Sequence, residues 1–328
     1  MYLLSICIPT YNRCDDLSSL LESIIKNCNE QISRNEIEIV ISDNASEDGT
    51  KYLVDTYRNR INTLKYHRNN NNIGFANNIR NVINIADGKY CWLMGDDDQI
   101  MKSAIDSVLK ALLSDPDIVI GNRNVNGVER KYLVNRGFQT FMIEGHSDFA
   151  TYVLKCQEIS AVFAFISTLI VSKKYWNSVD CTEWEKNHPY THTLQICRCI
   201  SEKRTNLQYI DTPLVEAGYN ITELNYTILP YFKLDLLTIV YIYEKIFKSY
   251  PPLVHAYRKL FKMQYTPLQV LKSRVESTVD EWNALIPNMM HFEYSNYLLL
   301  KKSYDPLLRQ VYYLAKKMNV VHKINRRI

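Results

Sequence analysis

The segment Tyr90-Cys91-Trp92-Leu93-Met94-Gly95-Asp96-Asp97-Asp98 places three consecutive carboxylates directly after a largely apolar run. The apolar part has the length and composition of a buried strand. Three adjacent carboxylates repel one another, so a cation or another positive group stabilises them. Acids near a helix start are common, however, and an isolated triplet is more often a solvated capping loop. Which of these two interpretations applies depends on the segments before and after the three acids.

Strands and helices alternate on both sides of this segment. Amphipathic helical stretches follow Asp15-Asp16, Ser46, Gly74 and the acids themselves. Apolar stretches that suit buried strands occur at residues 3–8, 37–41, 63–67, 90–94 and 117–120. This order predicts a doubly wound α/β fold, with a mostly parallel, Rossmann-like sheet flanked by helices. The apolar run 159–172 is too short to span a bilayer and predicts a buried strand or core helix.

Polar residues follow three of the predicted strands. They are Pro9, Thr10, Tyr11, Asn12 and Arg13 after the first, Asp43 and Asn44 after the second, and the acids after the fourth. Ligands of such sheets bind beyond the carboxyl ends of the strands, so we expect these side chains to converge. Tyr11 suits stacking on a base, Arg13 suits a phosphate, and Asp43 suits a hydrogen bond from a base or ribose. Each also fits an ordinary turn into a helix.

A further polar turn contains Asn72-Ile73-Gly74, with Asn78 behind it. Glycine permits close backbone approach, and a helix N-terminus favours phosphate. A capped helix explains the same residues, so this pattern is weak when it is taken alone.

Taken together, these segments resemble the family 2 glycosyltransferases of the GT-A fold, and most of all their O-antigen enzymes of the abequosyltransferase type. The resemblance covers about residues 1–125, and its motifs occur in the family's order and spacing. They are Ile6–Arg13 (ICIPTYNR), Val40–Thr50 (VISDNASEDGT), Asn72–Phe75 (NIGF) with Asn78, and Trp92–Asp98 (WLMGDDD).

The resemblance implies metal-assisted, inverting transfer of a sugar from a nucleotide-sugar donor to a saccharide acceptor in bacterial surface polysaccharide synthesis. Asp43 and the Pro9–Arg13 loop would line the base pocket, with Asn44, Gly74 and Asn78 also on the donor. Asp96 and Asp97 would contact the ribose and diphosphate. Because Gly95 replaces the first acid of the commoner motif, either Asp96 with Asp98 or the adjacent pair Asp97 and Asp98 would hold Mn²⁺ or Mg²⁺, with Asp98 favoured.

The catalytic base is harder to predict. Inverting relatives use a carboxylate, often in a Glu-Asp pair at a helix start, to take the acceptor proton. No such pair occurs between Asp180 and His192, where it would be expected. His192, Asp180, Glu183 and Glu185 are therefore rival candidates, and ordinary surface or structural roles suit each of them equally well.

Two other classes of function compete with glycosyl transfer. A nucleotidyltransferase or a dinucleotide oxidoreductase would need a glycine-rich phosphate loop after the first strand, and residues 9–12 contain no glycine. A binding-only subunit is disfavoured by the intact acids, but the uncertain base keeps this alternative open.

The charge of the chain is unevenly distributed. Of the net +4, residues 226–328 carry 16 Lys and Arg against 7 Asp and Glu. Helical spacing predicts a domain over residues 1–225 and a helical region over 226–328 with a basic amphipathic end. We expect a cytoplasmic protein with no nucleic-acid partner, and the basic end would suit peripheral attachment to the inner face of the membrane near a lipid-diphosphate-linked acceptor. The N-terminus does not resemble a signal peptide, and the 8 cysteines form no paired zinc pattern.

Overall fold

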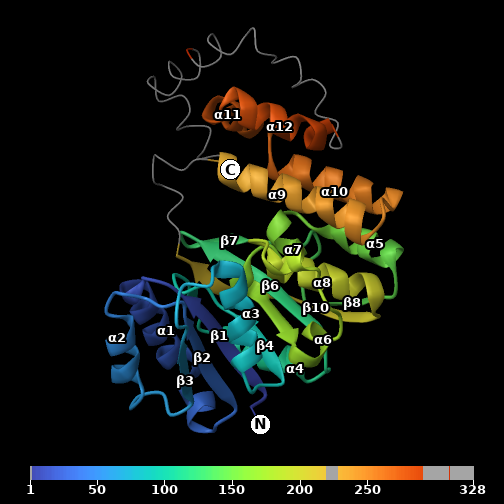
Figure 1. Cartoon of the computed structure of the whole chain (residues 1–328). Helices are drawn as coiled ribbons and strands as arrows, with labels where there is room; N and C mark the ends of the chain where they lie inside the picture. Colours follow the sequence, from blue (N-terminus) through green and yellow to red (C-terminus); the bar gives the residue numbers. More distant parts are fainter. Residues whose placement is uncertain (1, 219–227, 291–309, 311–328) are drawn as a thin grey trace. The chain divides into compact units, whose positions relative to one another are not determined.

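The computed structural model describes residues 2–218, 228–290 and Gln310, and the chain divides into two compact units, Met1–Thr222 and Glu223–Ile328 (Figure 1). The predicted boundary near residue 225 lies outside the described residues, as does nearly all of the basic tail.

The first unit is built on one ten-stranded sheet with the order β3-β2-β1-β4-β9-β6-β10-β5, to which β7 and β8 add at β6 and β10. The strands are β1 (Leu4–Thr10), β2 (Ile37–Asp43), β3 (Leu64–Arg68), β4 (Tyr90–Leu93), β5 (Gln99–Ile100), β6 (Ile118–Val125), β7 (Val128–Arg130), β8 (Gln139–Ile143), β9 (Leu169–Ser172) and β10 (Thr205–Ala217).

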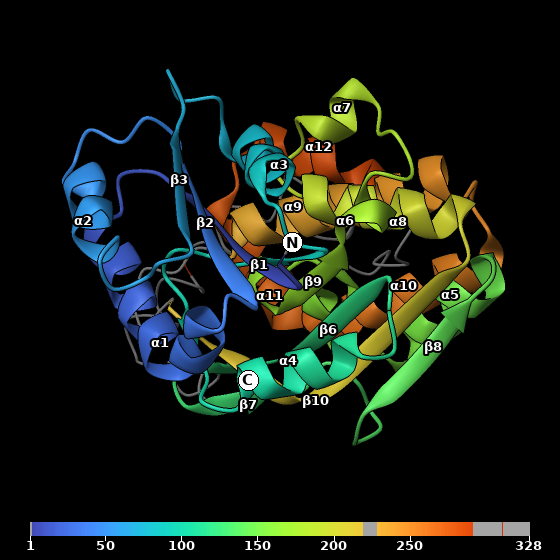
Figure 2. The ribbon, with the colours of Figure 1, turned by 90° about the horizontal axis from the view of Figure 1, so that it is seen from below.

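Helices join these strands and cover the sheet (Figure 2). They are α1 (Cys14–Ser33), α2 (Thr50–Tyr57), α3 (Phe75–Ile85), α4 (Ala104–Leu112), α5 (His146–Lys155), α6 (Lys173–Trp176), α7 (Glu183–Lys186) and α8 (Thr191–Glu202). The predicted α/β class, with a central sheet flanked by helices, is confirmed.

The sheet is parallel only in part. β3, β2, β1 and β4 pair in parallel, as crossover helices require. β9 then lies antiparallel between β4 and β6. β6 and β7 form a hairpin through Asn126-Gly127, both at positive φ. β6 and β10 also pair in parallel, over the longest ladder of the sheet, so the expected mostly parallel sheet is found with short antiparallel strands added to it.

The apolar run 159–172 is neither one strand nor one helix. It contains the 3₁₀ turns η1 (Ile159–Val162) and η2 (Ile166–Thr168), followed by β9. Phe163 ends the first turn with a left-handed backbone, at a φ of 73°. The chain consequently changes direction within an apolar segment, which periodicity alone does not reveal.

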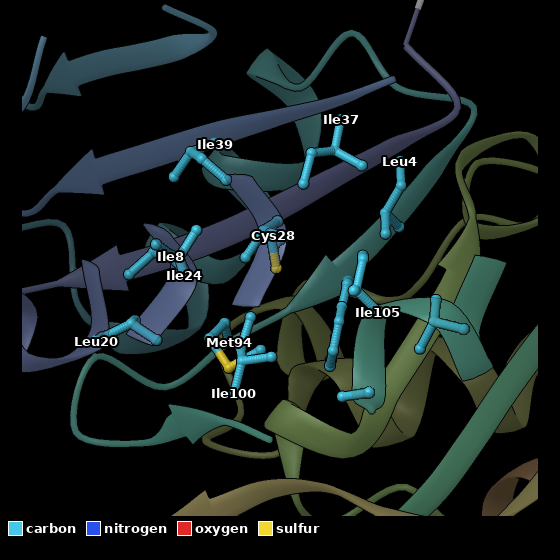
Figure 3. Close-up of a cluster of buried hydrophobic side chains, with 14 of the residues drawn as sticks. Leu4, Ile8, Leu20, Ile24, Cys28, Ile37, Ile39, Met94, Ile100 and Ile105 are labelled. Atoms are coloured by element: carbon cyan, nitrogen blue, oxygen red, sulfur yellow. The ribbon is translucent and has the colours of Figure 1, made fainter. Parts of the chain in front are cut away.

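A hydrophobic cluster fixes the register of the N-terminal strands. Ile8 and Met94, from β1 and the end of β4, lie with Leu20 and Ile24 of α1 and with Ile105 of α4 (Figure 3). Their complete burial contributes roughly 1.5–3 kcal/mol for each side chain. Within this register Thr10 lies opposite Asp43, and the Met94 N–H donates to the Cys7 carbonyl at 2.9 Å. The ends of β1, β2 and β4 therefore finish side by side.

The second unit is helical over residues 228–290. It contains α9 (Leu229–Tyr241), a π-helical turn (Ile242–Ile246), α10 (Pro251–Gln264), α11 (Pro267–Glu276) and α12 (Val279–Met290). Its core groups the rings of Phe232, Phe261, Tyr265 and Trp282, and the Tyr265 hydroxyl donates to Asp235 at 2.6 Å. Within the described ranges, no helix has the length and apolar content needed to cross a bilayer.

Candidate active site

The first acid of the cluster Asp96–Asp98, Asp96, is bound by the loop that follows β1. Thr10 Oγ1 donates to Asp96 Oδ2 at 2.8 Å, and the Arg13 guanidinium lies 3.1 Å from Oδ1. Asp96 is only 6% exposed, and burial raises its pKa to about 6 although Thr10 and Arg13 oppose the shift. The convergence of the first and fourth strand ends thus joins two segments far apart in the chain.

Arg13 also pairs with the second acid. Its guanidinium lies 3.0 Å from Asp97 Oδ2, and both side chains are partly exposed. One fixed cation therefore balances part of the negative charge on Asp96 and Asp97. The Arg13 side chain remains about half exposed, so it is accessible to a phosphate as well.

The third acid, Asp98, is bound by neutral donors. Oδ2 accepts a hydrogen bond from the Ser167 hydroxyl, and Oδ1 accepts one from the Gly218 N–H at 2.9 Å. Asp98 is 3% exposed, and burial raises its pKa to about 7. No cationic side chain in the described part of the chain forms an ion pair with it. Of the three acids, Asp98 is the one whose charge most requires a cation from outside the protein.

Ser167 and Gly218 shape this end of the site, and the sequence analysis missed both. The Ser167 hydroxyl accepts from the Gly95 N–H at 2.7 Å while it donates to Asp98, and Trp92 Nε1 donates to the Ser167 carbonyl at 2.9 Å. A side chain at position 218 would collide with the Asp97 carbonyl. Glycine is therefore required for the backbone to reach Asp98.

Asp96 and Asp98 would supply part of the ligand set of a divalent metal ion, but not all of it. No group of three or more His, Cys, Asp and Glu side chains is positioned to hold a metal ion within residues 2–218 and 228–290. Asp96 and Asp98 supply hard carboxylate oxygens, the ligands that Mg²⁺ and Mn²⁺ prefer. The remaining ligands would come from a diphosphate and water, as is usual for these ions.

Asp43 is completely buried at the end of β2. Its Oδ1 accepts from the Ser46 N–H at 2.8 Å, which is the turn that the sequence offered as an alternative. Its Oδ2 accepts from the Tyr66 hydroxyl at 2.6 Å, and Arg68 Nε lies 3.7 Å away. Burial and the bond to Asp43 raise the pKa of Tyr66. Sequence reasoning missed Tyr66 and Arg68, which lie on the short strand β3.

In the loop after β1, the side chain of Tyr11 is free to stack on a ligand, whereas that of Asn12 is held by hydrogen bonds. Tyr11 is 44% exposed, whereas Asn12 adopts a positive φ of 52° and holds the loop after β2. The Asn12 N–H donates to Ser46 Oγ at 2.9 Å, and Asn12 Oδ1 accepts from the Glu47 N–H at 2.8 Å. Pro9 lies opposite Ser42, one pair before the ladder to β2 ends at Thr10 and Asp43.

Asparagines connect the end of β2 to the start of α3. Asn44 Oδ1 accepts from Asn69 at 3.1 Å and from the Ile73 N–H at 2.9 Å. Asn78 Oδ1 accepts from Ser42 Oγ at 2.7 Å and from Asn69 at 3.0 Å. Gly74 precedes α3 with a φ of 81°, a conformation that favours glycine. Asn44 and Asn78 therefore fix the loops at this edge, with Asn69 as a link that the sequence did not reveal.

Two of the four candidate bases are engaged in other contacts. Glu185 has no exposed surface, and it accepts from the Thr182 N–H at 2.8 Å and pairs with Arg198 at 2.8 Å. The capping box and this ion pair make it a structural residue of α7 and α8. Glu183 is exposed and pairs with Lys186 at 2.9 Å, which lowers its pKa. Asp180 is exposed in the loop before α7.

His192 lies in the first turn of α8 and is 1% exposed. Its Nε2 donates to the Ala164 carbonyl at 3.3 Å, and its Nδ1 has no hydrogen-bond partner in the described residues. Burial lowers the pKa of His192 to about 4. The imidazole is therefore neutral near pH 7, with a lone pair available on Nδ1. It contacts the same short segment that carries Ser167.

Comparison with known proteins agrees with this geometry. Residues 5–168 match the model of the glycosyl transferase family 2. The chain is 34% identical, over 65% of its length, to the abequosyltransferase RfbV of Salmonella typhimurium, and the match spans 66% of that protein.

Two solved structures share the fold. TarS of S. aureus, in complex with UDP-GlcNAc, superposes with a TM-score of 0.60 at 19% identity, over 97% of this chain and 89% of that one. A mannosyltransferase from Pyrobaculum calidifontis, in complex with GDP-Man and Mn²⁺, gives a TM-score of 0.52 at 16% identity, over 97% and 86%. The sequence motifs, the strand-end geometry and the family match agree, and the chain belongs to glycosyl transferase family 2.

Proposed function

We propose that this protein transfers a sugar from a nucleotide-sugar donor to a saccharide acceptor in the synthesis of a bacterial surface polysaccharide. The observation that carries the proposal is Asp98, a buried carboxylate after β4 that Ser167 and Gly218 orient and that forms no ion pair with a cationic side chain within the described residues. A nucleoside diphosphate that arrives with a divalent ion supplies the missing charge. The acids then lie where the leaving group of such a donor would be.

We infer an inverting displacement at the anomeric carbon. An acceptor hydroxyl oxygen forms the new bond to this carbon, the bond to the diphosphate oxygen breaks, and its electron pair leaves with the diphosphate. A protein base takes the hydroxyl proton. Asp98 and Asp96 would hold Mn²⁺ or Mg²⁺, which offsets the charge that develops on the departing diphosphate. Asp97 and Arg13 face the same region from the exposed side.

His192 is our choice for the base. Glu185 is buried in an ion pair, Glu183 is paired at the surface, and Asp180 has no link to the acids in the described structure. His192 has a neutral ring whose Nδ1 has no hydrogen-bond partner among the described residues. Its Nε2 donates to the carbonyl of Ala164, which precedes Ser167 by three residues. Because the ring is covered, the acceptor must open a path to it, and the transfer rate should fall as the pH approaches about 4.

The experiment that tests the function measures donor binding and donor cleavage together. Thermal unfolding would be followed with UDP-, GDP-, CDP- and dTDP-sugars, with Mn²⁺ or with a chelator, because a bound donor stabilises the native state. Release of nucleoside diphosphate would be measured for the wild type, Asp98→Asn and the exposed control Asp106→Asn. Metal-dependent cleavage that only Asp98→Asn loses supports a transferase. Binding without cleavage indicates a binding-only subunit, and no binding of any donor refutes the proposal.

We further propose that the second unit attaches the enzyme to an anionic membrane surface, where a lipid-linked acceptor would be found. Helix α10 contains no acid and carries His255, Arg258, Lys259 and Lys262 at helical spacing, around a depression of about 340 Å³. Such a face favours anionic lipid. Co-sedimentation with phosphatidylglycerol vesicles should be lost in Lys259→Glu/Lys262→Glu and kept in the control Lys26→Glu/Lys51→Glu. Equal sedimentation of both variants would contradict membrane attachment through α10.

A further inference from the structure

The segment from α7 to the first turn of α8 carries four aromatic rings in succession. Only the last of them, His192, has a role in the proposed reaction. The rings of Trp184 and His188 lie 4.7 Å apart, those of His188 and Tyr190 6.5 Å, and those of Tyr190 and His192 5.8 Å. We call these four residues the aromatic row. The row begins at a half-exposed indole and ends at the buried imidazole proposed as the base.

Trp184 differs from the other tryptophans of this chain. All four lie in the described residues, and Trp92, Trp176 and Trp282 are 0–3% exposed, whereas Trp184 is 50% exposed. An exposed indole offers a large apolar face that a ligand can cover, and covering it contributes favourably to binding. An exposed ring also suits a partner with one apolar face and several polar groups.

The scaffold beneath the row is rigid. The Thr182 capping box and the Glu185–Arg198 ion pair hold α7 against α8. The Tyr190 N–H donates to His188 Nδ1 at 3.1 Å, which orients that imidazole. A surface whose side chains are already ordered loses less entropy when it binds a ligand. The side chains of the aromatic row are therefore ordered before a ligand binds, which favours binding.

Two contacts place the row beside the donor residues. Asn77 of α3 donates to Asn187 at 3.1 Å, and both overall views show α7 next to α3 (Figures 1 and 2). On the other side, Thr193 Oγ1 donates to the Phe163 carbonyl at 3.0 Å, and His192 bonds Ala164. The same segment continues to Ser167, which binds Asp98. The aromatic row is thus anchored both to α3 and to the segment that holds the acid cluster.

We propose that the aromatic row binds the acceptor saccharide, with Trp184 stacking on the C–H face of a sugar and Tyr190 directing it towards His192. This inference rests on the proposed transferase function. The charged neighbours of Trp184 in the chain are paired, Glu183 with Lys186 at 2.9 Å and Glu185 with Arg198 at 2.8 Å, so this surface suits an uncharged ligand. A hydroxyl-rich ring with apolar C–H edges has the amphipathic character that such aromatic sites select.

The test uses Trp184 as its own reporter. Acrylamide quenches the fluorescence of exposed indoles, so quenching in this protein reports mainly Trp184. Quenching would be measured with methyl glycosides of glucose, galactose, mannose, rhamnose and N-acetylglucosamine, each up to 100 mM, with UDP and Mg²⁺ present. We expect at least one glycoside to reduce the quenching constant twofold or more.

Variants that keep the reporter decide whether the row is responsible. His188→Ala and Tyr190→Ala should lose at least half of the protection, whereas Tyr52→Ala, an exposed aromatic residue on α2, should keep it. Thermal unfolding of each variant shows that it is folded. No protection by any glycoside overturns the proposal, as does protection that both row variants retain.

The donor-binding screen distinguishes a failure here from a failure of the proposed function. If no nucleotide-sugar binds but a glycoside still protects Trp184, the transferase proposal fails and the saccharide site stands. If donors bind and are cleaved but no glycoside protects Trp184, only the saccharide site is refuted.

Discussion

The two sides of the candidate site are built in different ways. On one side, the ends of β1, β2 and β4 place Thr10, Asp43 and Asp96 through strand register. On the other side, the segment from Ala164 to His192 holds Ser167 and the aromatic row through tight turns and side-chain contacts. The first side follows from the sheet, and the second depends on local contacts that single substitutions can remove.

The largest effect should come from the residue where the two sides meet. Asp98→Asn removes the carboxylate that Ser167 and Gly218 orient, so we expect cleavage of the donor to fall by about 10²–10³-fold. The rate of nucleoside diphosphate release at saturating donor and Mn²⁺ measures this. Retention of the wild-type rate in Asp98→Asn would mean that the acids are only a capping loop.

The ion pair between α7 and α8 tests how strongly the second side depends on single contacts. Glu185→Ala removes the ion pair to the partly exposed Arg198 and the capping-box acceptor of α7, and should destabilise the protein by about 2–3 kcal/mol. Urea unfolding gives this value, and Glu183→Ala, which removes an exposed acid two residues away, should leave the stability close to that of the wild type. Equal effects of the two variants would contradict a structural role for Glu185.

His192 should make stability depend on pH. Burial lowers its folded-state pKa to about 4, below the usual value near 6.5, so the unfolded chain binds the proton more readily. Its contribution is complete above about pH 6.5 and is lost as the pH falls towards 4. We expect the wild type to lose about 2–3 kcal/mol more than His192→Gln between pH 7 and pH 4. A parallel loss in both proteins would show that this imidazole is not buried as described.

The smallest effect concerns the contact of Ser167 with the acids. Ser167→Ala removes a donor to Asp98 and an acceptor for the Gly95 N–H, so the affinity for Mn²⁺ in the presence of UDP should fall about 10-fold. Isothermal titration measures this affinity. Ser167→Thr keeps the hydroxyl and should recover part of the lost affinity. An affinity in Ser167→Ala equal to that of the wild type would show that Ser167 does not contribute to metal binding by the acids.

Sequence reasoning works well where an effect is local. Strand periodicity predicted β1, β2 and β4, and a general property of parallel sheets predicted that Thr10, Asp43 and Asp96 would meet. Tyr66 and Arg68 were missed because their partner Asp43 lies on another strand, and the pairing register decides which side chains reach it.

The other side was less predictable for a physical reason. Ser167 lies in an apolar run that resembles a strand, and only the left-handed turn at Phe163 makes the run change direction. Glu185 looked like a possible base because its partner Arg198 is one helix further along the chain. Long-range pairing of this kind leaves no periodic signal in the sequence.

Gly218 limits where the chain can be divided. A fragment that ends at residue 217 would keep every strand of the sheet but would lose the N–H that binds Asp98 Oδ1. Such a fragment should fold and yet hold Asp98 by one hydrogen bond instead of two. Any attempt to separate the two units must therefore cut after Gly218, because this residue, the first beyond the sheet, still binds the acid cluster.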